Sequence, residues 1–249
     1  MLRDLVMKRC PADLHIHSCL SPCAEPDMTP RRIIDGAVER GLGIIAIADH
    51  NSAENLEVAG RIAQSKGITV LPAMEITSYE EAHVLALFGS VGSAVAMQDV
   101  VYRNLSEGLN DERFLGYQLV VNEEDEIIRF NPRLLITTTG LHLKDLVDAI
   151  HSFGGLAVAS HIDRGSFSVI SQLGFISDEM GFDALEISCN TRRERAEALF
   201  GAYAAIPWIT SSDAHNLGDI GKRTTSFFLE EASFDEIARA FRGERKVEW

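Results

Sequence analysis

Short apolar segments alternate with amphipathic segments along the first third of the chain. The run Gly43–Ala48 is almost entirely apolar, which is typical of a central strand covered on both faces. Residues 29–41 and 52–67 have apolar side chains at helical spacing, begin with a capping residue and end with glycine. Alternation of strands and helices in this order predicts a parallel β/α architecture.

The first predicted strand, Asp13–Ser18, contains a His-x-His pair. If alternate side chains share a face, Asp13, His15 and His17 point one way and the two apolar residues between them point the other. Divalent transition metals favour neutral imidazole nitrogen as a ligand. The pair therefore indicates a metal site, although a lone His-x-His also occurs in strands for packing alone.

The remaining segments continue this alternation with one interruption, at residues 91–139. There, residues 117–121 and 127–130 are joined by the acidic stretch 122–126, which predicts a β-hairpin. No long linker separates this region, so we expect an inserted helical and hairpin excursion within a single domain of residues 1–249. We predict further strands at 68–73, 83–88, 156–160, 183–188, 207–211 and 224–229, and helices at 191–203 and 233–242. A further predicted helix has its apolar positions between Leu143 and Ile150 and is stopped by Gly154-Gly155.

Histidines gather at the edges of the predicted strands, and parallel strands end at one rim of their sheet. Together with Glu75 and Asp213 they form a set rich in imidazole and carboxylate, which suits Zn, Mn or Fe better than Ca or Mg. The set exceeds the four ligands of a zinc site, so it predicts two or three divalent metal ions. The six histidines are His15, His17, His50, His83, His161 and His215, whereas His142 and His151 share one predicted helix and are expected at the surface.

In their order along the chain, these motifs resemble those of the PHP (polymerase and histidinol phosphatase) family of metal-dependent phosphoesterases. The resemblance extends from Asp13 to about Thr225. It implies an α/β fold, a distorted seven-stranded (β/α)7 TIM-like barrel with its metal site at the C-terminal rim of the strands, and hydrolysis of phosphate esters. The motifs are Ala12-Asp-Leu-His-Ile-His-Ser18, Asp49-His50, Glu75, His83, Ser160-His161 and Ser212-Asp-Ala-His215.

The resemblance also implies how the metals share their ligands, with Glu75 as a bridge. One metal would take His15, His17, Glu75 and Asp213, a second Glu75, His83 and His161, and a third His50 and His215. Where the family commonly has Asp or His in the loop after the first strand, this chain has Ser21-Pro22-Cys23. Cys23 would either complete the third site as a thiolate, which favours zinc, or be a small buried residue without a ligand role.

We hypothesise that a metal-bridging hydroxide attacks a small phosphate monoester or a nucleotide-type phosphoester. Asp213 is predicted to orient or deprotonate the nucleophile, and Arg164 to bind the phosphate through its guanidinium. Asp13 and Asp49 are predicted either to fix histidine tautomers from behind the ligands or to serve as caps or surface pairs.

The formal net charge of −14 argues against a long nucleic-acid surface, because such surfaces depend on clustered Lys and Arg. We therefore expect a small phosphorylated substrate and no membrane partner. The four cysteines have no zinc-binding or disulfide pattern, and Met1–Cys10 has no signal-peptide core. Both observations favour a cytoplasmic protein.

Two alternatives come from other functional classes. Amidohydrolases that cleave C–N bonds also carry His-x-His on their first barrel strand, but they usually bridge their metals with a lysine where this chain offers Glu75. A non-catalytic, metal-stabilised module that binds a nucleotide or a protein is the second alternative.

Overall fold

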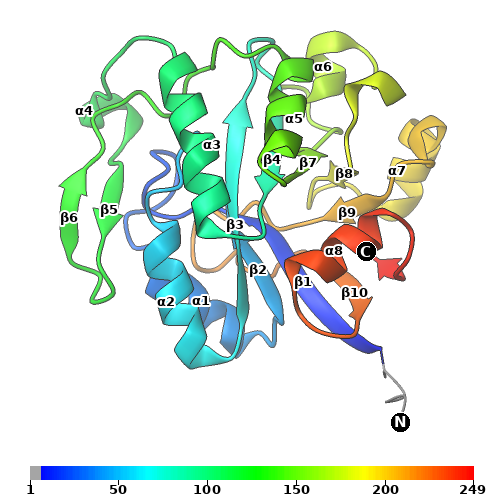
Figure 1. The fold of residues 1–249 in the computed structure, drawn as a ribbon, viewed down its shortest axis with the longest axis horizontal. Coiled ribbons are helices and arrows are strands. Elements are labelled where there is room, and N and C mark those ends of the chain that lie inside the picture. The colour runs from blue at the N-terminus through cyan, green and yellow to red at the C-terminus, as the bar shows by residue number, and fades with distance from the viewer. Residues whose placement is uncertain (1–6) are drawn as a thin grey trace.

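A computed structural model describes residues 7–249, in which nine strands form one sheet that curves into a nearly closed barrel (Figure 1). The strands follow one another in the order β11-β10-β1-β2-β3-β4-β7-β8-β9. The predicted α/β barrel is thus confirmed, while residues 1–6 of the segment expected to lack a signal-peptide core lie outside the described residues. The strands are β1 (Lys8–Ile16), β2 (Ile44–Ile47), β3 (Thr69–Thr77), β4 (His83–Leu87), β7 (Leu156–Ala159), β8 (Ala184–Ile187), β9 (Trp208–Thr210), β10 (Thr225–Leu229) and β11 (Val247–Glu248).

The barrel closes near the end of β1. Ile16 forms a parallel bridge with Ala214, and the backbone N–H of His17 donates to the Ala214 carbonyl over 2.9 Å. Further down, the hydroxyl of Thr225 on β10 accepts from the backbone N–H of Thr210 and donates to its carbonyl, both at 2.8 Å. These contacts bring the segment after β9 directly beside His17.

Strand β4 departs from the predicted parallel arrangement, because it runs antiparallel to both β3 and β7. A short turn joins β3 to β4, with no helix between them. An antiparallel strand places its first residue at the rim where parallel neighbours end. His83 therefore lies at the same rim as the residues that follow β1, β2 and β7.

The helices and the predicted hairpin lie around the sheet (Figure 1). Helix α1 begins as predicted, with Thr29 as its cap and Pro30 in its first turn. Helix α2 begins later than predicted, because the Ser52 hydroxyl is hydrogen-bonded to Gln98 (3.2 Å) and Tyr102 (2.7 Å) of α3. The elements are α1 (Pro30–Glu39), α2 (Leu56–Lys66), α3 (Val91–Asn104), α4 (Glu112–Leu115), β5 (Leu119–Val121), β6 (Ile127–Phe130), α5 (Leu143–Ser152), α6 (Val169–Leu173), α7 (Arg193–Phe200) and α8 (Phe234–Phe241).

Two apolar clusters stabilise the barrel. The larger cluster joins the strands to the surrounding helices, and the smaller one includes Leu14, Val158 and residues of α8 such as Phe241. The pairing of β1 with β2 shifts register between Asp13 and Ile16, so Leu14 packs in the smaller cluster and Ile16 in the larger one. Leu14 and Ile16 are both buried in apolar packing, as expected, but they pack in different clusters, so the expectation that they share one face is wrong.

The antiparallel hairpin of β5 and β6 is confirmed and forms its own two-stranded sheet, at the left of Figure 1. Its turn lies against α1 and α2, where Arg31 and Arg61 both hydrogen-bond Glu123. That 91–139 is an insertion within one domain stays a prediction. Among the described helices, none has the length and apolarity that a bilayer crossing requires.

Candidate metal centre

A buried carboxylate, Glu75, lies at the middle of a ring of imidazoles at one rim of the barrel. It sits inside β3, opposite His50 across a parallel bridge, and is 1% exposed. The neighbouring imidazoles come from four separate segments, one of which carries both His15 and His17, so only the closed barrel brings them together. Oε1 of Glu75 is 3.0 Å from His83 Nδ1, 3.2 Å from His161 Nε2 and 3.3 Å from His15 Nε2, while Oε2 is 3.2 Å from His50 Nδ1 and 3.5 Å from His17 Nε2.

Asp213 is the second carboxylate at this rim. Its Oδ1 is 3.1 Å from His17 Nε2 and 3.6 Å from His15 Nε2, and its Oδ2 is 2.5 Å from Nη2 of Arg164. Asp213 and His161 have φ angles of 51° and 29°, in the left-handed region that non-glycine residues rarely adopt. Such strain persists where surrounding contacts impose it, and it gathers at functional sites.

The predicted third set of ligands also converges. One donor atom each from His17, Cys23, His50 and His215 lie within 4.8 Å of one another. Cys23 is exposed and lines the pocket, so the alternative of a small buried residue is wrong. Desolvation and the nearby Glu75 carboxylate raise the pKa of the Cys23 thiol to about 12, so a thiolate forms there only beside a cation.

The spacing and the unpaired atoms of this cluster fit divalent cations. Two ligands of one tetrahedral zinc ion lie about 3.4 Å apart, close to the imidazole-to-carboxylate distances here. Buried polar atoms normally have hydrogen-bond partners. Several donor atoms of this cluster have none among the described residues: Nε2 of His15 and His17, Nδ1 of His50 and His83, and Oδ1 of Asp213.

Burial and charge shift the protonation of these groups in opposite directions. Burial by itself would lower the pKa of His15, but the carboxylates of Glu186, Glu75 and Asp213 raise it well above its usual value. Burial and neighbouring imidazoles lower the pKa of His50 well below its usual value and that of His215 to about 4. Despite burial, the surrounding imidazoles keep the pKa of Glu75 and of Asp213 low. The carboxylates are thus ionised at neutral pH.

A third buried carboxylate, Glu186 on β8, supports the ring from behind and was missed by the sequence reasoning. Its oxygens are 3.0 and 3.2 Å from His15 Nδ1, and Oε2 accepts from the backbone N–H of His161 over 3.1 Å. Such contacts fix the orientation of an imidazole ligand. The sequence did contain a signal for this role, because Glu186 lies within a predicted strand of the barrel and shares a face with Ser188.

Neither Asp13 nor Asp49 contacts a histidine ring directly, although both were predicted to fix histidine tautomers. Asp13 accepts from Ser212 and from the backbone N–H of Gly221, and burial raises its pKa to about 6. It therefore anchors the loop that carries Asp213, so the prediction of a direct contact with an imidazole is wrong for Asp13.

Asp49 reaches the ring through one intermediary. It accepts from the hydroxyls of Ser18 and Ser21 at 2.6 and 2.7 Å, and the Ser21 hydroxyl is 3.0 Å from His17 Nδ1. Asp49 thus orients His17 through Ser21 and makes no direct contact with the ring.

The ring lies at the base of a pocket of about 180 Å³. Arg164 lines this pocket, with 36% of its side chain exposed, and the Asp213 carboxylate helps to raise the pKa of its guanidinium despite partial burial. Phe167 and Ile136 add apolar surface, so the excursion also contributes to the pocket. His142 and His151 lie outside it: they pair with Glu80 and Asp183 at the surface.

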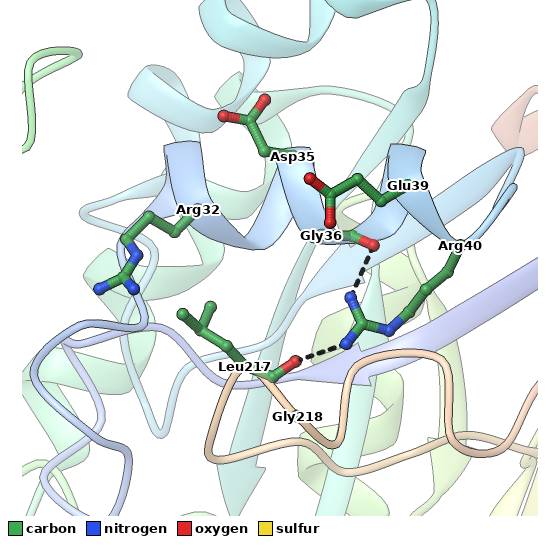
Figure 2. A pocket seen from close by; sticks show the side chains of 7 residues that line it. All are labelled: Arg32, Asp35, Gly36, Glu39, Arg40, Leu217 and Gly218. Carbon is green, nitrogen blue, oxygen red and sulfur yellow. Dashed lines mark hydrogen bonds between the residues drawn. The ribbon is translucent and has the colours of Figure 1, made fainter.

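The loop after Asp213 is also fastened to the end of α1, through Arg40 (Figure 2). From the end of α1, the Arg40 guanidinium donates to the carbonyl of Gly36 over 2.9 Å and to that of Leu217 over 3.1 Å. A separate surface pocket, lined by Arg32, Asp35 and these residues, surrounds this link. Arg40 therefore ties the outer helix to the segment that carries His215.

Comparison with known proteins places this geometry among related folds. The family described as PHP-associated matches residues 193–245. YqxK of Bacillus subtilis, an uncharacterised protein, is 26% identical over 277 aligned positions, which cover 97% of this chain and 64% of that protein. A Bacteroides vulgatus two-domain protein containing a predicted PHP-like metal-dependent phosphoesterase has a TM-score of 0.58 at 17% identity, covering 99% of this chain and 66% of that one.

Endonuclease Q has the same fold. The lesion-specific enzyme from Pyrococcus furiosus has a TM-score of 0.73 at 18% identity, covering 96% of this chain and 58% of that chain. A complex of endonuclease Q with a 27-mer duplex substrate, which carries an abasic lesion at the active site, has a TM-score of 0.74, covering 97% of this chain and 58% of that chain, also at 18% identity. This chain therefore spans less than two thirds of the length of YqxK and of endonuclease Q.

The complex with duplex DNA overturns the exclusion of nucleic acid, and with it the expectation of only a small phosphorylated partner. Net charge was a poor guide because it averages over the whole surface and counts no bound cations, whereas the local field of a cleft decides what binds there.

Proposed function

We infer that this chain, a member of the PHP family, is a metal-dependent hydrolase that cleaves phosphodiester bonds of nucleic acid. One observation carries the inference: donor atoms around Glu75 and Asp213 are spaced for several cations, beside a guanidinium that can hold a phosphate. Bound divalent cations would supply an activated water and neutralise the phosphate oxygens. The fold shared with endonuclease Q supports nucleic acid as the substrate class.

We assign the ligands to three groups, of which the third shares His17 with the first and His50 with the second. How these two histidines are divided decides whether two or three ions of Zn, Mn or Fe bind. The groups are His15, His17 and Asp213; His50, Glu75 and His83; and His17, Cys23, His50 and His215. His161 would join the second group, because its Nε2 is 3.2 Å from Glu75 Oε1.

Arg164 would bind the phosphate, and Asp213 would act on the attacking water. Arg164 stays cationic and can donate two hydrogen bonds to non-bridging oxygens once it leaves Asp213. Asp213 then has Oδ2 free to accept a proton from, or to orient, an attacking water. Glu186 keeps His15 in place throughout, because it contacts Nδ1 and leaves Nε2 facing the carboxylates of Glu75 and Asp213.

The test compares two double variants after reconstitution with Mn²⁺, Zn²⁺ or Fe²⁺. H15A/H17A should lose bound metal and hydrolysis of single- and double-stranded oligonucleotides while keeping the fold. H142A/H151A removes two histidines that lie outside the pocket and should behave like the parent chain. Hydrolysis of a cyclic amide but of no phosphodiester would favour the amidohydrolase, and undiminished turnover of H15A/H17A would exclude these two residues as ligands.

A further inference from the structure

An exposed aromatic ring stands at the mouth of the pocket beside the candidate ligands. Phe167 lines the same cavity as Glu75 and Arg164, and 45% of its surface is exposed. Its ring is stacked on His83, with centroids 4.9 Å apart and ring planes inclined by 21°. An exposed aromatic ring beside a polar pocket that could bind cations is suited to stack on a ligand group that is itself apolar and flat.

The backbone of Phe167 adopts a strained conformation that fixes the position of this ring. Phe167 has a φ of 56°, which is unfavourable for a residue with a Cβ atom. Its carbonyl accepts from the His83 N–H over 2.9 Å, and the next residue, Ser168, caps α6 and donates its hydroxyl to the Arg164 carbonyl over 2.8 Å. Contacts with the rim therefore impose the strained conformation that places Phe167 at the pocket mouth.

One short segment thus carries three kinds of group that face the pocket: an imidazole, a guanidinium and an aromatic ring. His161, Arg164 and Phe167 all lie within it, and Asp163 fastens it to Ser188 by two hydrogen bonds of 2.7 Å. A phosphate held by Arg164 would leave the attached nucleoside at the mouth, because a cavity of about 180 Å³ has little room beyond the phosphate and its cations.

Resting on the proposed function, we propose that Phe167 is the stacking platform for a nucleobase next to the cleaved phosphate. Aromatic side chains stack on any base because every base has a π face. A base inside a continuous duplex is covered on both faces by its neighbours. The structure therefore favours a substrate whose base beside the cleaved bond is unstacked, as in a single strand or at a distorted site. Phe167 is in this sense a specificity-determining residue.

The experiment compares a thymidine homopolymer with an abasic tetrahydrofuran homopolymer of equal length, cleaved by the metal-loaded protein. F167A should lower kcat/KM for the thymidine polymer by about 10- to 100-fold and leave the abasic polymer unchanged. F167W should retain base-dependent cleavage, and F167L, which is apolar but has no π face, should not. F175A is the matched control, since Phe175 is also exposed (55%) but does not line the pocket.

Each other outcome contradicts the proposal in its own way. If F167A slows both polymers equally and loses metal, Phe167 only shields His83. If F167A slows neither, or if the parent chain cleaves both polymers equally well, no base is bound there. If the parent chain cleaves neither polymer in any of its metal forms, the proposed function itself is wrong and this inference falls with it.

Discussion

The rim of the barrel and the C-terminal end of the chain both bury carboxylates, and they neutralise them in opposite ways. Near α8, Glu236 is 4% exposed, and its oxygens accept from Arg245 at 2.7 and 2.8 Å and from Arg239 at 2.9 Å. At the rim, Glu75 and Asp213 face imidazole nitrogens that lack hydrogen-bond partners. We call Glu230, Glu236, Arg239 and Arg245 the C-terminal ion cluster.

The difference separates a structural charge cluster from a binding site. In the C-terminal ion cluster, the protein supplies the cations itself, so the cluster is complete without a ligand. At the rim, Arg164 pairs with Oδ2 of Asp213, but Oδ1 of Asp213 and several imidazole nitrogens still lack hydrogen-bond partners among the described residues, which leaves room for positive charge from outside. Buried charges that the chain does not neutralise indicate a ligand more reliably than burial or charge alone.

The largest contrast should come from removing one carboxylate from each region. E75Q should lower metal affinity more than about 100-fold and abolish turnover, because Glu75 faces five imidazoles. Its matched control, E236Q, should keep full metal content. Metal per chain and turnover measure both effects, and an E75Q protein that binds metal normally would remove the contrast.

A smaller effect should follow from changing Glu186, which supports His15 without facing the pocket. E186Q should weaken metal affinity about 10- to 100-fold, since such outer carboxylates orient the ligand and raise its basicity. E197Q removes an exposed carboxylate on neighbouring α7 and should leave affinity unchanged. Metal titration by calorimetry checks this, and equal affinity in the two variants would assign Glu186 a purely structural role.

The pH dependence of metal binding should be smaller still. Carboxylates raise the pKa of His15 well above 6.5, so its imidazole is protonated at pH 7 before metal binds. A metal requires the neutral ring, and binding should therefore release a proton and strengthen by about tenfold per pH unit around neutrality. Calorimetry in buffers of different ionisation enthalpy counts the protons, and a buffer-independent heat would contradict the prediction.

E236Q should leave metal binding unchanged and lower the stability of the fold. Arg245 and Arg239 lower the pKa of Glu236 to about 2, below its usual 4.5. A lowered pKa in the folded state stabilises the protein above pH 4.5, and the contribution disappears as the pH falls through 2. E236Q should lose about 2 kcal/mol of unfolding free energy at pH 7. The gap to the parent chain, measured on both metal-free proteins, should close in acid, and a gap that stays constant would contradict the assigned cause.

Much of the architecture follows from local patterns. Thr29 with Pro30 sets the start of α1, and the acidic turn between residues 121 and 127 sets the β5–β6 hairpin. Helix α2 was placed too early because its expected cap, Ser52, is hydrogen-bonded to α3, which is distant in sequence. Ser52 is engaged by Gln98 and Tyr102, and no local rule reveals that contact.

The candidate site divides in the same way. Spacing and strand ends identified the residues that surround Glu75, because each lies at or next to the end of a strand. Three features were not identified, because their roles depend on partners from other segments. They are Glu186, the link from Asp49 to His17 through Ser21, and Phe167.

The sequence by itself determined most of the strands and helices and which metal-binding side chains lie near their ends, because periodicity and capping act over a few residues. The short helix α6 and the strand β11 were not predicted. Only the tertiary structure decided that β4 runs backwards, that the register of β1 shifts, and that three carboxylates meet one ring of imidazoles. The physical reason is that strand direction and charge compensation depend on contacts between distant segments, which exist only once the barrel has closed.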